Sequence, residues 1–354
     1  MHRFDKTSLP FIGLLVVSSV ACVGVAWAAT PPSVENPWRA LHVISYRTDD
    51  DLARLAGQLP QLARMGVNCL ILEVNYAFEF VSHPELRQGD QQITKAGAQR
   101  FLASCRQNGI ELVPQFMCLG HQSWGKNTHP LLTKYPELDL TPGAFPNNEG
   151  IYCREWDPMN PKTNEIVFAL IDELIDAFEA KAFHVGMDEV FLLSSEHAPA
   201  TKHLDPADVF AKVVNDLHGH IVKQRGLTML MWADRLIDGE RFDMGEWEAS
   251  KVGTAPAVDK IPKDIILSPW HYEPREAYES LPMFMEKGFR VLPASWKTTD
   301  ATLALIRYGR ANQTEGRLVG HIFTTWSQRR DDWSEFEPLV KGLALLNESA
   351  SDKP

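Results

Sequence analysis

The chain has 354 residues, of which 44% are hydrophobic and 23% charged, and its formal net charge is -11 at pH 7. That length is enough for a large core in one big domain or two small ones, and the composition is that of a globular protein. The acidic balance, without any run of Lys or Arg, excludes a nucleic-acid partner, because phosphate binding needs clustered positive charge.

The first 28 residues predict a signal peptide. Arg3 and Lys6 lie before the apolar run "FIGLLVVSSVACVGV", and "AWA" places small residues where a signal peptidase cleaves, before Ala29. We therefore expect an exported protein, periplasmic or secreted. The alternatives are an uncleaved anchor or lipid attachment at Cys22. No later segment approaches the roughly 20 apolar residues of a membrane span, so we expect none in the mature chain.

Four cysteines follow the signal peptide: Cys69, Cys105, Cys118 and Cys153. Their spacings match no metal motif, and Cys69 fits a buried apolar position in a strand. Export permits disulfides. A bridge between Cys118 and Cys153, which flank a long loop, stays open.

Eight short apolar runs alternate with amphipathic stretches after the signal peptide. Helices are predicted where apolar residues recur at three- and four-residue steps or where start and stop signals enclose a stretch, at residues 49–66, 162–180, 206–226, 300–316 and 335–348. The strands are predicted at residues 40–46, 67–76, 110–117, 182–189, 227–234, 264–272, 289–297 and 318–326.

Strands that alternate with helices imply a parallel sheet. Eight such units fit a (β/α)8 TIM barrel, which typically needs roughly 250 residues plus insertions. An open doubly wound sheet is the rival, but the glycine-rich first turn typical of that fold is missing from "SYRTDDD". We predict a single catalytic barrel at 38–347, after an N-terminal extension at 29–37 and before a tail at 348–354. The stretch from 118 to 160, rich in Pro, Gly and Asn, is predicted to be an active-site insertion.

Polar and aromatic residues gather at the predicted strand ends, where a TIM barrel carries its chemistry. Four tryptophans on four consecutive strand ends would wall a pocket for the apolar faces of a sugar ring, with Arg47, Glu73 and Asp234 placed to bond its hydroxyls. The candidate substrate-binding residues are Arg47, Glu73, His121, Trp232, Asp234, Trp270, Tyr272, Trp296 and Trp326.

Two acids end the fourth run, "KAFHVGMDEV". If that strand ends at Asp188, its side chain points into the barrel mouth with His184 and Gly186, and Glu189 can swing over the same pocket. The plainer interpretation has Asp188 capping the next helix and Glu189 in solvent. Asp188 and Glu189 are the predicted catalytic pair.

At these residues the sequence resembles glycoside hydrolase family 20, the β-N-acetylhexosaminidases. "HVGMDE" fits the family's strand-four motif position by position, the resemblance covers about residues 38 to 347, and it is closest to the compact, single-domain hexosaminidase D-like branch. The resemblance implies hydrolysis of terminal GlcNAc or GalNAc, in which the substrate's 2-acetamido oxygen attacks its own anomeric carbon. Neither a cofactor nor a metal is expected.

The resemblance also implies residue roles. Asp188 would orient the acetamido nitrogen, and Glu189 would protonate the leaving oxygen and then activate water. Arg47 would grip the outer hydroxyls and His121 would lie beside the acid. Trp232 and Trp326 would wall the sugar pocket, and Tyr272 would bond the acetamido oxygen.

The sequence departs from the family pattern at two places. Ile44 stands where an aspartate is common, and Gln328 stands at the place of a glutamate that holds the terminal sugar. The acidic partner of His121 is open, with Glu73 or Asn75 as substitutes. The alternatives are a non-catalytic carbohydrate-binding barrel, a barrel glycosidase of different specificity, and a metal-dependent hydrolase using His184, Asp188 and His121. Sugar preference, linkage, natural substrate, exo or endo action and oligomeric state stay open.

Overall fold

The computed structural model describes residues 31–326 and 329–348. The predicted signal peptide, Gln328 and the tail beyond Glu348 lie outside these residues. None of the helices in the described ranges is long and apolar enough to span a membrane.

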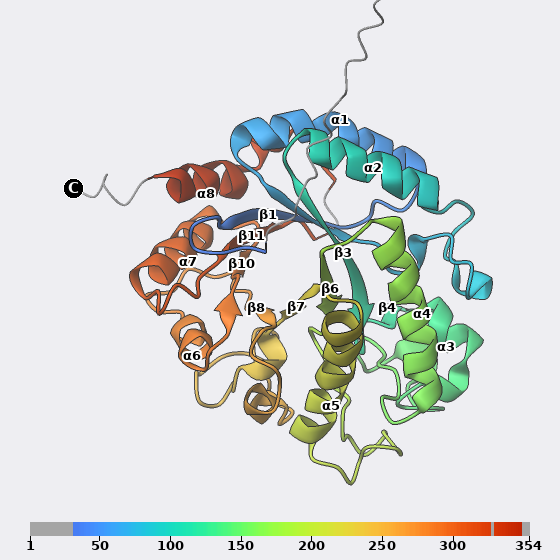
Figure 1. The fold of residues 1–354 in the computed structure, drawn as a ribbon. Coiled ribbons are helices and arrows are strands. Elements are labelled where there is room, and N and C mark those ends of the chain that lie inside the picture. Colours follow the sequence, from blue (N-terminus) through green and yellow to red (C-terminus); the bar gives the residue numbers. More distant parts are fainter. Residues whose placement is uncertain (1–30, 327–328, 349–354) are drawn as a thin grey trace, which may run out of the picture.

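A curled sheet of parallel strands forms the centre of the molecule (Figure 1). Its order is β10-β11-β1-β2-β3-β6-β7-β8-β9. The strands are β1 (Trp38–Val43), β2 (Cys69–Glu73), β3 (Glu111–Cys118), β6 (Ala182–Gly186), β7 (Thr228–Trp232), β8 (Ile266–Ser268), β9 (Arg290–Val291), β10 (Ala294–Ser295) and β11 (Gly320–Thr324). Every one of the eight predicted runs overlaps at least one of these strands.

The seventh predicted strand is broken in two. β9 pairs with β8, and β10 pairs with β11, because Pro293 lies between them and cannot donate to the ladder. The N–H of Leu292 still bonds the carbonyl of Leu267, and the N–H of Ile322 bonds the carbonyl of Pro293. The two pieces therefore act as one barrel strand that joins β8 to β11, and the predicted (β/α)8 barrel is confirmed.

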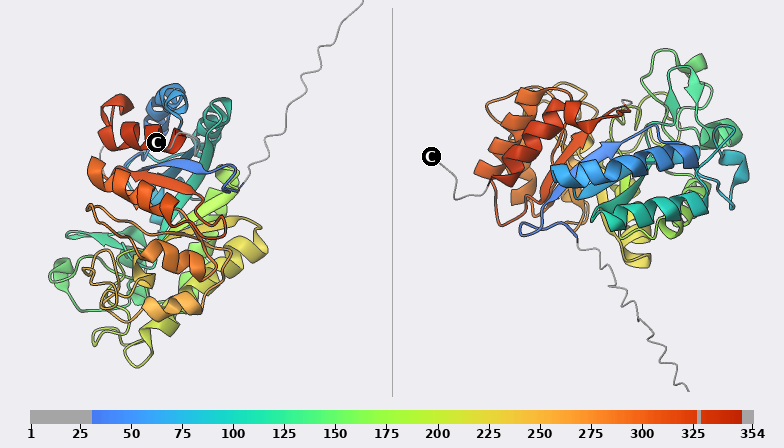
Figure 2. Two further views of the ribbon diagram at one scale, coloured as in Figure 1. Left: turned by 90° about the vertical axis from the view of Figure 1, so that its left-hand side faces the viewer. Right: turned by 90° about the horizontal axis from the view of Figure 1, so that it is seen from above.

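Helices surround the sheet (Figures 1 and 2). They are α1 (Asp49–Met65), α2 (Lys95–Gln107), α4 (Pro161–Ala177), α5 (Pro206–His218), α6 (Ser280–Glu286), α7 (Thr299–Ala311) and α8 (Glu337–Asn347), with a π-helical turn at Gly219–Gln224 after α5. The start of α1 is fixed by Thr48, whose side chain accepts from the N–H of Asp51, and its end by Gly66 at φ 105°.

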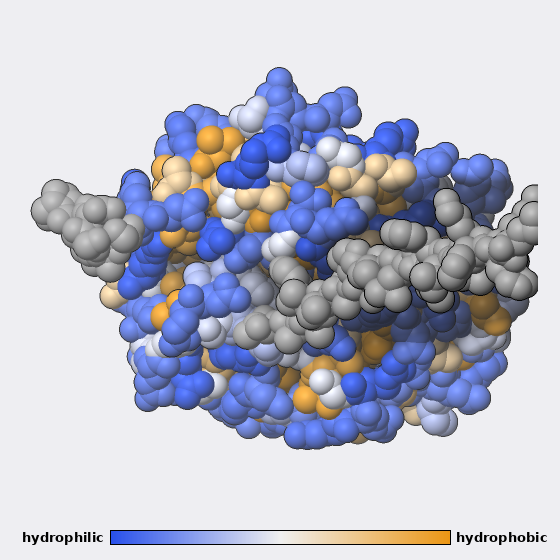
Figure 3. Space-filling model, turned by 45° about the horizontal axis from the view of Figure 1, so that its top comes forward, coloured by the Kyte–Doolittle hydropathy of each residue, from blue (hydrophilic) through white to orange (hydrophobic). Residues whose placement is uncertain are grey.

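Two apolar layers hold the fold together. Alternate side chains of the strands, such as Ala40, Ile71, Val113 and Leu230, fill the barrel interior, and Trp232 closes it toward the carboxyl ends of the strands. The other strand face packs on the helices in a much larger cluster. Polar residues surround small apolar patches on the face shown in Figure 3.

The insertion after β3 is folded around one buried cation. It contains β4 (Ser123–Trp124), β5 (Asn127–Thr128) and α3 (Pro130–Lys134). Arg154 donates to Oδ1 of Asn148 at 2.6 Å, to Oδ2 of Asp139 at 2.5 Å, and to two backbone carbonyls. Because this guanidinium ties distant parts of the insertion together, the insertion is an ordered wall of the barrel mouth.

Candidate functional site

The strand that carries the two acids ends earlier than predicted. β6 stops at Gly186, and the chain then turns through left-handed backbone at Gly186 (φ 67°), Met187 (φ 77°) and Glu189 (φ 53°). A Cβ at residue 186 would also lie 2.7 Å from Sδ of Met117, so only glycine fits there. This turn breaks the alternation of side chains along a strand. The side chains of Asp188 and Glu189, although adjacent in the sequence, can therefore point toward the same group.

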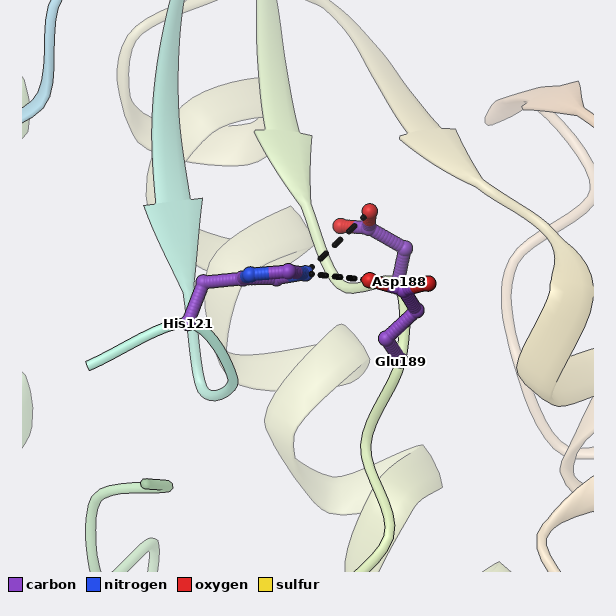
Figure 4. Close-up of side chains that lie close together, drawn as sticks. All are labelled: His121, Asp188 and Glu189. Atoms are coloured by element: carbon purple, nitrogen blue, oxygen red, sulfur yellow. Dashed lines mark ion pairs between the residues drawn. The ribbon is translucent and has the colours of Figure 1, made fainter. Parts of the chain in front are cut away.

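His121 is that meeting place (Figure 4). Its Nε2 lies 3.1 Å from Oε2 of Glu189 and 3.4 Å from Oδ2 of Asp188. The side chains of Asp188, Glu189 and His121 are 4%, 15% and 16% exposed, so the group is enclosed yet reachable. The acidic partners of His121 are thus the two catalytic candidates themselves. Asn75 instead accepts the backbone N–H of Met117 at 2.8 Å.

The two acids favour the charged form of His121. Burial alone would lower the pKa of its imidazole, but the charge of Asp188 and the hydrogen bonds to Asp188 and Glu189 raise it well above the ordinary value. Conversely, burial lowers the pKa of His42 to about 4 and holds that of His184 well below its ordinary value. The two acids thus outweigh the effect of burial on the pKa of His121, whereas burial dominates at His42 and His184.

Asp234 supports the turn after β6 through a hydrogen bond to its backbone. Its Oδ2 accepts the N–H of Glu189 at 3.0 Å and Nε of Arg235 at 2.6 Å, and its Oδ1 accepts Nε1 of Trp270 at 3.3 Å. Asp234 and Arg235 are fully buried. The sequence predicted that Asp234 bonds sugar hydroxyls; the structure instead places it to position the backbone of Glu189.

The predicted tryptophans and tyrosine form one connected aromatic group. Trp232 is fully buried, with its ring 4.6 Å from His184 and 5.8 Å from Trp326. Trp270 stacks on Tyr272 at 4.9 Å, and Nε1 of Trp326 donates to the Tyr272 hydroxyl at 2.7 Å. The ring of Trp296 lies 5.5 Å from that of Tyr272. Trp232 and Trp270 are buried, whereas Tyr272, Trp296 and Trp326 are half-buried.

Glu73 lies close enough to His121, Asp188 and Arg47 to interact with their charges. Burial raises the pKa of Glu73 to about 7, while the charges of His121 and Arg47 oppose that shift and the charge of Asp188 adds to it. Gln115 donates to Glu73 at 3.3 Å. Arg47 is exposed, which leaves its guanidinium free to meet a ligand at the barrel mouth. Ile44, at the place of the family's aspartate, is half-buried.

Several residues of the insertion complete the site without having been predicted. Sγ of Cys153 accepts the N–H of His121 at 3.3 Å and lies 3.7 Å from the carbonyl of Glu189. Oε1 of Glu155 accepts the N–H groups of Phe191 and Leu192 at 2.6 and 2.7 Å. Cys118 and Cys153 are both free thiols, so the bridge left open by the sequence is not formed. Loop residues without periodicity give no sequence signal for such contacts.

Metal-ligand atoms of His121, Asp188 and Glu189 lie within 4.8 Å of one another, so these three could hold a cation. His184, expected in the metal-dependent alternative, is not among them. It is fully buried, and its Nδ1 accepts the N–H of Gly186 at 3.1 Å.

The fold and the site together define the class: a (β/α)8 barrel that gathers carboxyl groups and aromatic side chains at the carboxyl ends of its strands, the edge that carries chemistry in barrel enzymes. The family model "Glycosyl hydrolase family 20, catalytic domain" matches residues 42–331. The chain belongs to this family, as its motif resemblance indicated.

Similar proteins agree with that assignment. A β-hexosaminidase of Emericella nidulans is 23% identical over 280 residues, which cover 73% of this chain and 43% of that protein. A lacto-N-biosidase of Bifidobacterium bifidum is 22% identical over 57% of this chain and 16% of its own length. The chain thus spans less than half the length of these curated relatives.

Solved structures share the fold. A β-N-acetylhexosaminidase from Bacteroides fragilis matches with a TM-score of 0.60 at 13% identity, over 86% of this chain and 65% of that one. A chitobiase from Flavobacterium johnsoniae matches with a TM-score of 0.61 at 20% identity, over 86% and 48%.

Proposed function

We propose that the protein is an exported, retaining β-N-acetylhexosaminidase that hydrolyses terminal GlcNAc or GalNAc by substrate-assisted catalysis. Family membership supports the activity. The observation that carries the mechanism is the left-handed turn after β6, which brings Asp188 and Glu189 against the same imidazole nitrogen.

In the first step, the carbonyl oxygen of the acetamido group attacks the anomeric carbon and forms a cyclic oxazolinium ion. Asp188 lies deeper, at 4% exposure, and its charge stabilises the N–H that becomes cationic. Tyr272 retains a hydroxyl proton for the acetamido oxygen. The glycosidic bond breaks as Glu189 gives its proton to the leaving oxygen.

In the second step, the carboxylate of Glu189 takes a proton from water, which attacks the anomeric carbon and reopens the ring. Two inversions leave the configuration unchanged. His121 binds both acids and limits their movement, and Asp234 fixes the backbone of the residue that transfers the proton.

Two alternatives make different predictions. A carbohydrate-binding barrel without turnover would bind N-acetylated sugars and hydrolyse none. A glycosidase of different specificity would prefer substrates that lack the acetamido group. Nitrophenyl N-acetylglucosaminide, N-acetylgalactosaminide and glucoside, assayed with the purified protein, separate them, because the proposal requires hydrolysis of at least one of the first two and not of the third.

The same assay tests the metal-dependent alternative, and N-terminal sequencing tests export. The proposal predicts that dialysis against a chelator leaves activity unchanged. If activity is lost on dialysis and restored by a divalent ion, a metal-dependent mechanism at His121, Asp188 and Glu189 would replace the proposed mechanism. For export, we expect N-terminal sequencing of the mature protein to start at Ala29. An intact Met1 would contradict cleavage, and a lipid-modified Cys22 would support the anchored alternative.

A further inference from the structure

Arg329 connects the segment after β11 to the segment after β1, two strands that are neighbours in the sheet. Its guanidinium donates to Oδ1 of Asp51 at 2.7 Å and to Oδ2 at 2.8 Å, and it also donates to the backbone carbonyl of Ser45. The same guanidinium lies 4.9 Å from the ring centre of Tyr46. One side chain therefore bonds the connection between β1 and α1 on either side of Arg47.

The backbone around Arg47 depends on these contacts. Ser45 has left-handed backbone, with φ at 71°, which a residue other than glycine adopts only where surrounding contacts hold it. Arg329 supplies such a contact at the Ser45 carbonyl. Two residues later, Oδ2 of Asp51 accepts the backbone N–H of Arg47 at 2.8 Å. The direction in which the Arg47 side chain leaves the backbone is thus set by Arg329 and Asp51 together.

The segment that carries Arg329 is itself attached to α1. Nε2 of Gln58 donates to the backbone carbonyl of Arg330 at 2.7 Å. One turn further along the helix, Nε2 of Gln61 donates to Oδ1 of Asp332 at 2.6 Å. The guanidinium of Arg329 therefore starts from a backbone fixed to the same helix as its carboxylate partner, which lowers the entropy lost in forming the contact.

The charge of Arg47 acts inside the barrel mouth, although its side chain is exposed. Burial lowers the pKa of His129, and the charges of His121 and Arg47 lower it further. The charge of Arg47 also opposes the rise that burial causes in the pKa of Glu73. Glu73 ends β2 and His129 lies in the insertion, so the guanidinium of Arg47 is within electrostatic reach of two walls of the site.

We infer that Arg329 is a positioning residue for substrate binding, because it fixes the backbone from which Arg47 reaches the hydroxyl groups of the terminal sugar. This inference rests on the proposed function and adds a residue to its binding site. The effect passes through Ser45 and Asp51, so Arg329 needs no contact with the substrate. A planar guanidinium suits this role, since it bonds a carboxylate with two N–H groups and keeps donors for a carbonyl.

A double-mutant cycle on the hydrolysis of nitrophenyl N-acetylglucosaminide tests the inference. Arg329→Gln should raise KM by about tenfold, the scale of one lost hydrogen bond to a charged group, and leave kcat nearly unchanged. In an Arg47→Ala background the same substitution should have no further effect on KM, because the group that it positions is gone. Arg329→Lys should restore part of the wild-type KM, since an ammonium group keeps the charge and loses the two-pronged contact.

Arg54→Gln is the matched control. Arg54 donates to Oδ1 of the same Asp51 carboxylate from the next turn of α1, and its side chain is 68% exposed. Its substitution removes the same charge beside Asp51 and leaves the bond from Arg329 to Ser45 in place, so KM should stay near the wild-type value. A rise in KM equal to that of Arg329→Gln would reduce the effect to lost charge and overturn the inference.

The remaining outcomes are also distinct. An unchanged KM in Arg329→Gln, a fall in kcat alone, or a rise in KM that is equal with and without Arg47 overturns the positioning role. The affinity of the same variants for N-acetylglucosamine, measured by calorimetry, gives a readout that needs no turnover. If the wild type hydrolyses no substrate but Arg329→Gln weakens binding only when Arg47 is present, the proposed function fails and the positioning role stands. A wild type that neither hydrolyses nor binds overturns both.

Discussion

The backbone N–H of Glu189 donates a 3.0 Å hydrogen bond to Oδ2 of Asp234, a carboxylate that Arg235 holds at 2.6 Å in full burial. The residue proposed to move the proton is thus fixed through its main chain, and its carboxyl group stays free for chemistry. Asp234→Asn should weaken this support and leave Arg235 without its counter-charge, because a buried cation that loses its partner is destabilising.

For Asp234→Asn we expect a fall in kcat of at least about tenfold with little change in KM, because misplacement of a catalytic group by about 1 Å is costly. We also expect a loss of about 3 kcal/mol in unfolding free energy. Chemical denaturation and steady-state kinetics check both. Asp238→Asn, an exposed aspartate in the same loop, is the control. An Asp234→Asn enzyme with normal kcat would refute the positioning role.

The loss of activity on removal of the proton donor should depend on the leaving group of the substrate. Glu189→Gln should reduce kcat by about 10²- to 10⁴-fold on methyl N-acetylglucosaminide, and much less on the nitrophenyl glycoside, whose leaving group departs without protonation. Asp188→Asn should reduce both by a similar factor, since it acts on the acetamido group. Equal losses in Glu189→Gln on both substrates would assign proton transfer elsewhere.

The charge of His121 should appear in the pH dependence of stability. Its pKa is raised in the folded protein by Asp188 and Glu189 against the effect of burial, so the ion pairs stabilise the fold fully below the unfolded pKa of about 6.5 and weaken as pH rises through the folded value. The unfolding free-energy difference between wild type and His121→Gln should therefore be larger at about pH 6 than at alkaline pH. His203→Gln, an exposed histidine, should show no such trend, and a flat His121→Gln difference would contradict the assignment.

Much of the fold could be predicted from the hydrophobic pattern of the sequence. The rest depends on tertiary contacts that leave no such pattern. Eight apolar runs and their intervening helices predict the barrel, but the run at 289–297 does not disclose that Pro293 splits it. The motif "HVGMDE" identifies Asp188 and Glu189, whereas the left-handed backbone at Met187 that makes them neighbours of His121 is set by tertiary packing. The helices α2 and α6 were not predicted.

The insertion was the least predictable part of the site. It was expected at the active site, but its loops have no periodicity, so Cys153 and Glu155 gave no signal of their own. They are sequence neighbours of Arg154, whose buried guanidinium bonds Asn148 and Asp139 within the insertion. Asp234 shows the opposite case: its strand-end position was correctly noted, and only the structure shows that its oxygens are already occupied.

Glu155 provides a test of how the insertion supports the loop after the acids. Burial raises its pKa to about 7 against two backbone hydrogen bonds, so the folded state binds a proton more tightly than the unfolded state does. Stability should fall as pH rises between about 4.5 and 7, by about 3 kcal/mol from this group. Glu155→Gln should remove that slope in denaturation at about pH 5 and 8, and Glu165→Gln, exposed on α4, should keep it. An unchanged slope in Glu155→Gln would place the titration elsewhere.

The central claim is that the substrate's own amide, held by Asp188, is the nucleophile. A thiazoline that mimics the cyclised intermediate tests it most directly, through steady-state inhibition of nitrophenyl N-acetylglucosaminide hydrolysis. We predict competitive inhibition by the thiazoline, weakened in Asp188→Asn. Hydrolysis that proceeds at its full rate in the presence of saturating thiazoline would contradict the mechanism.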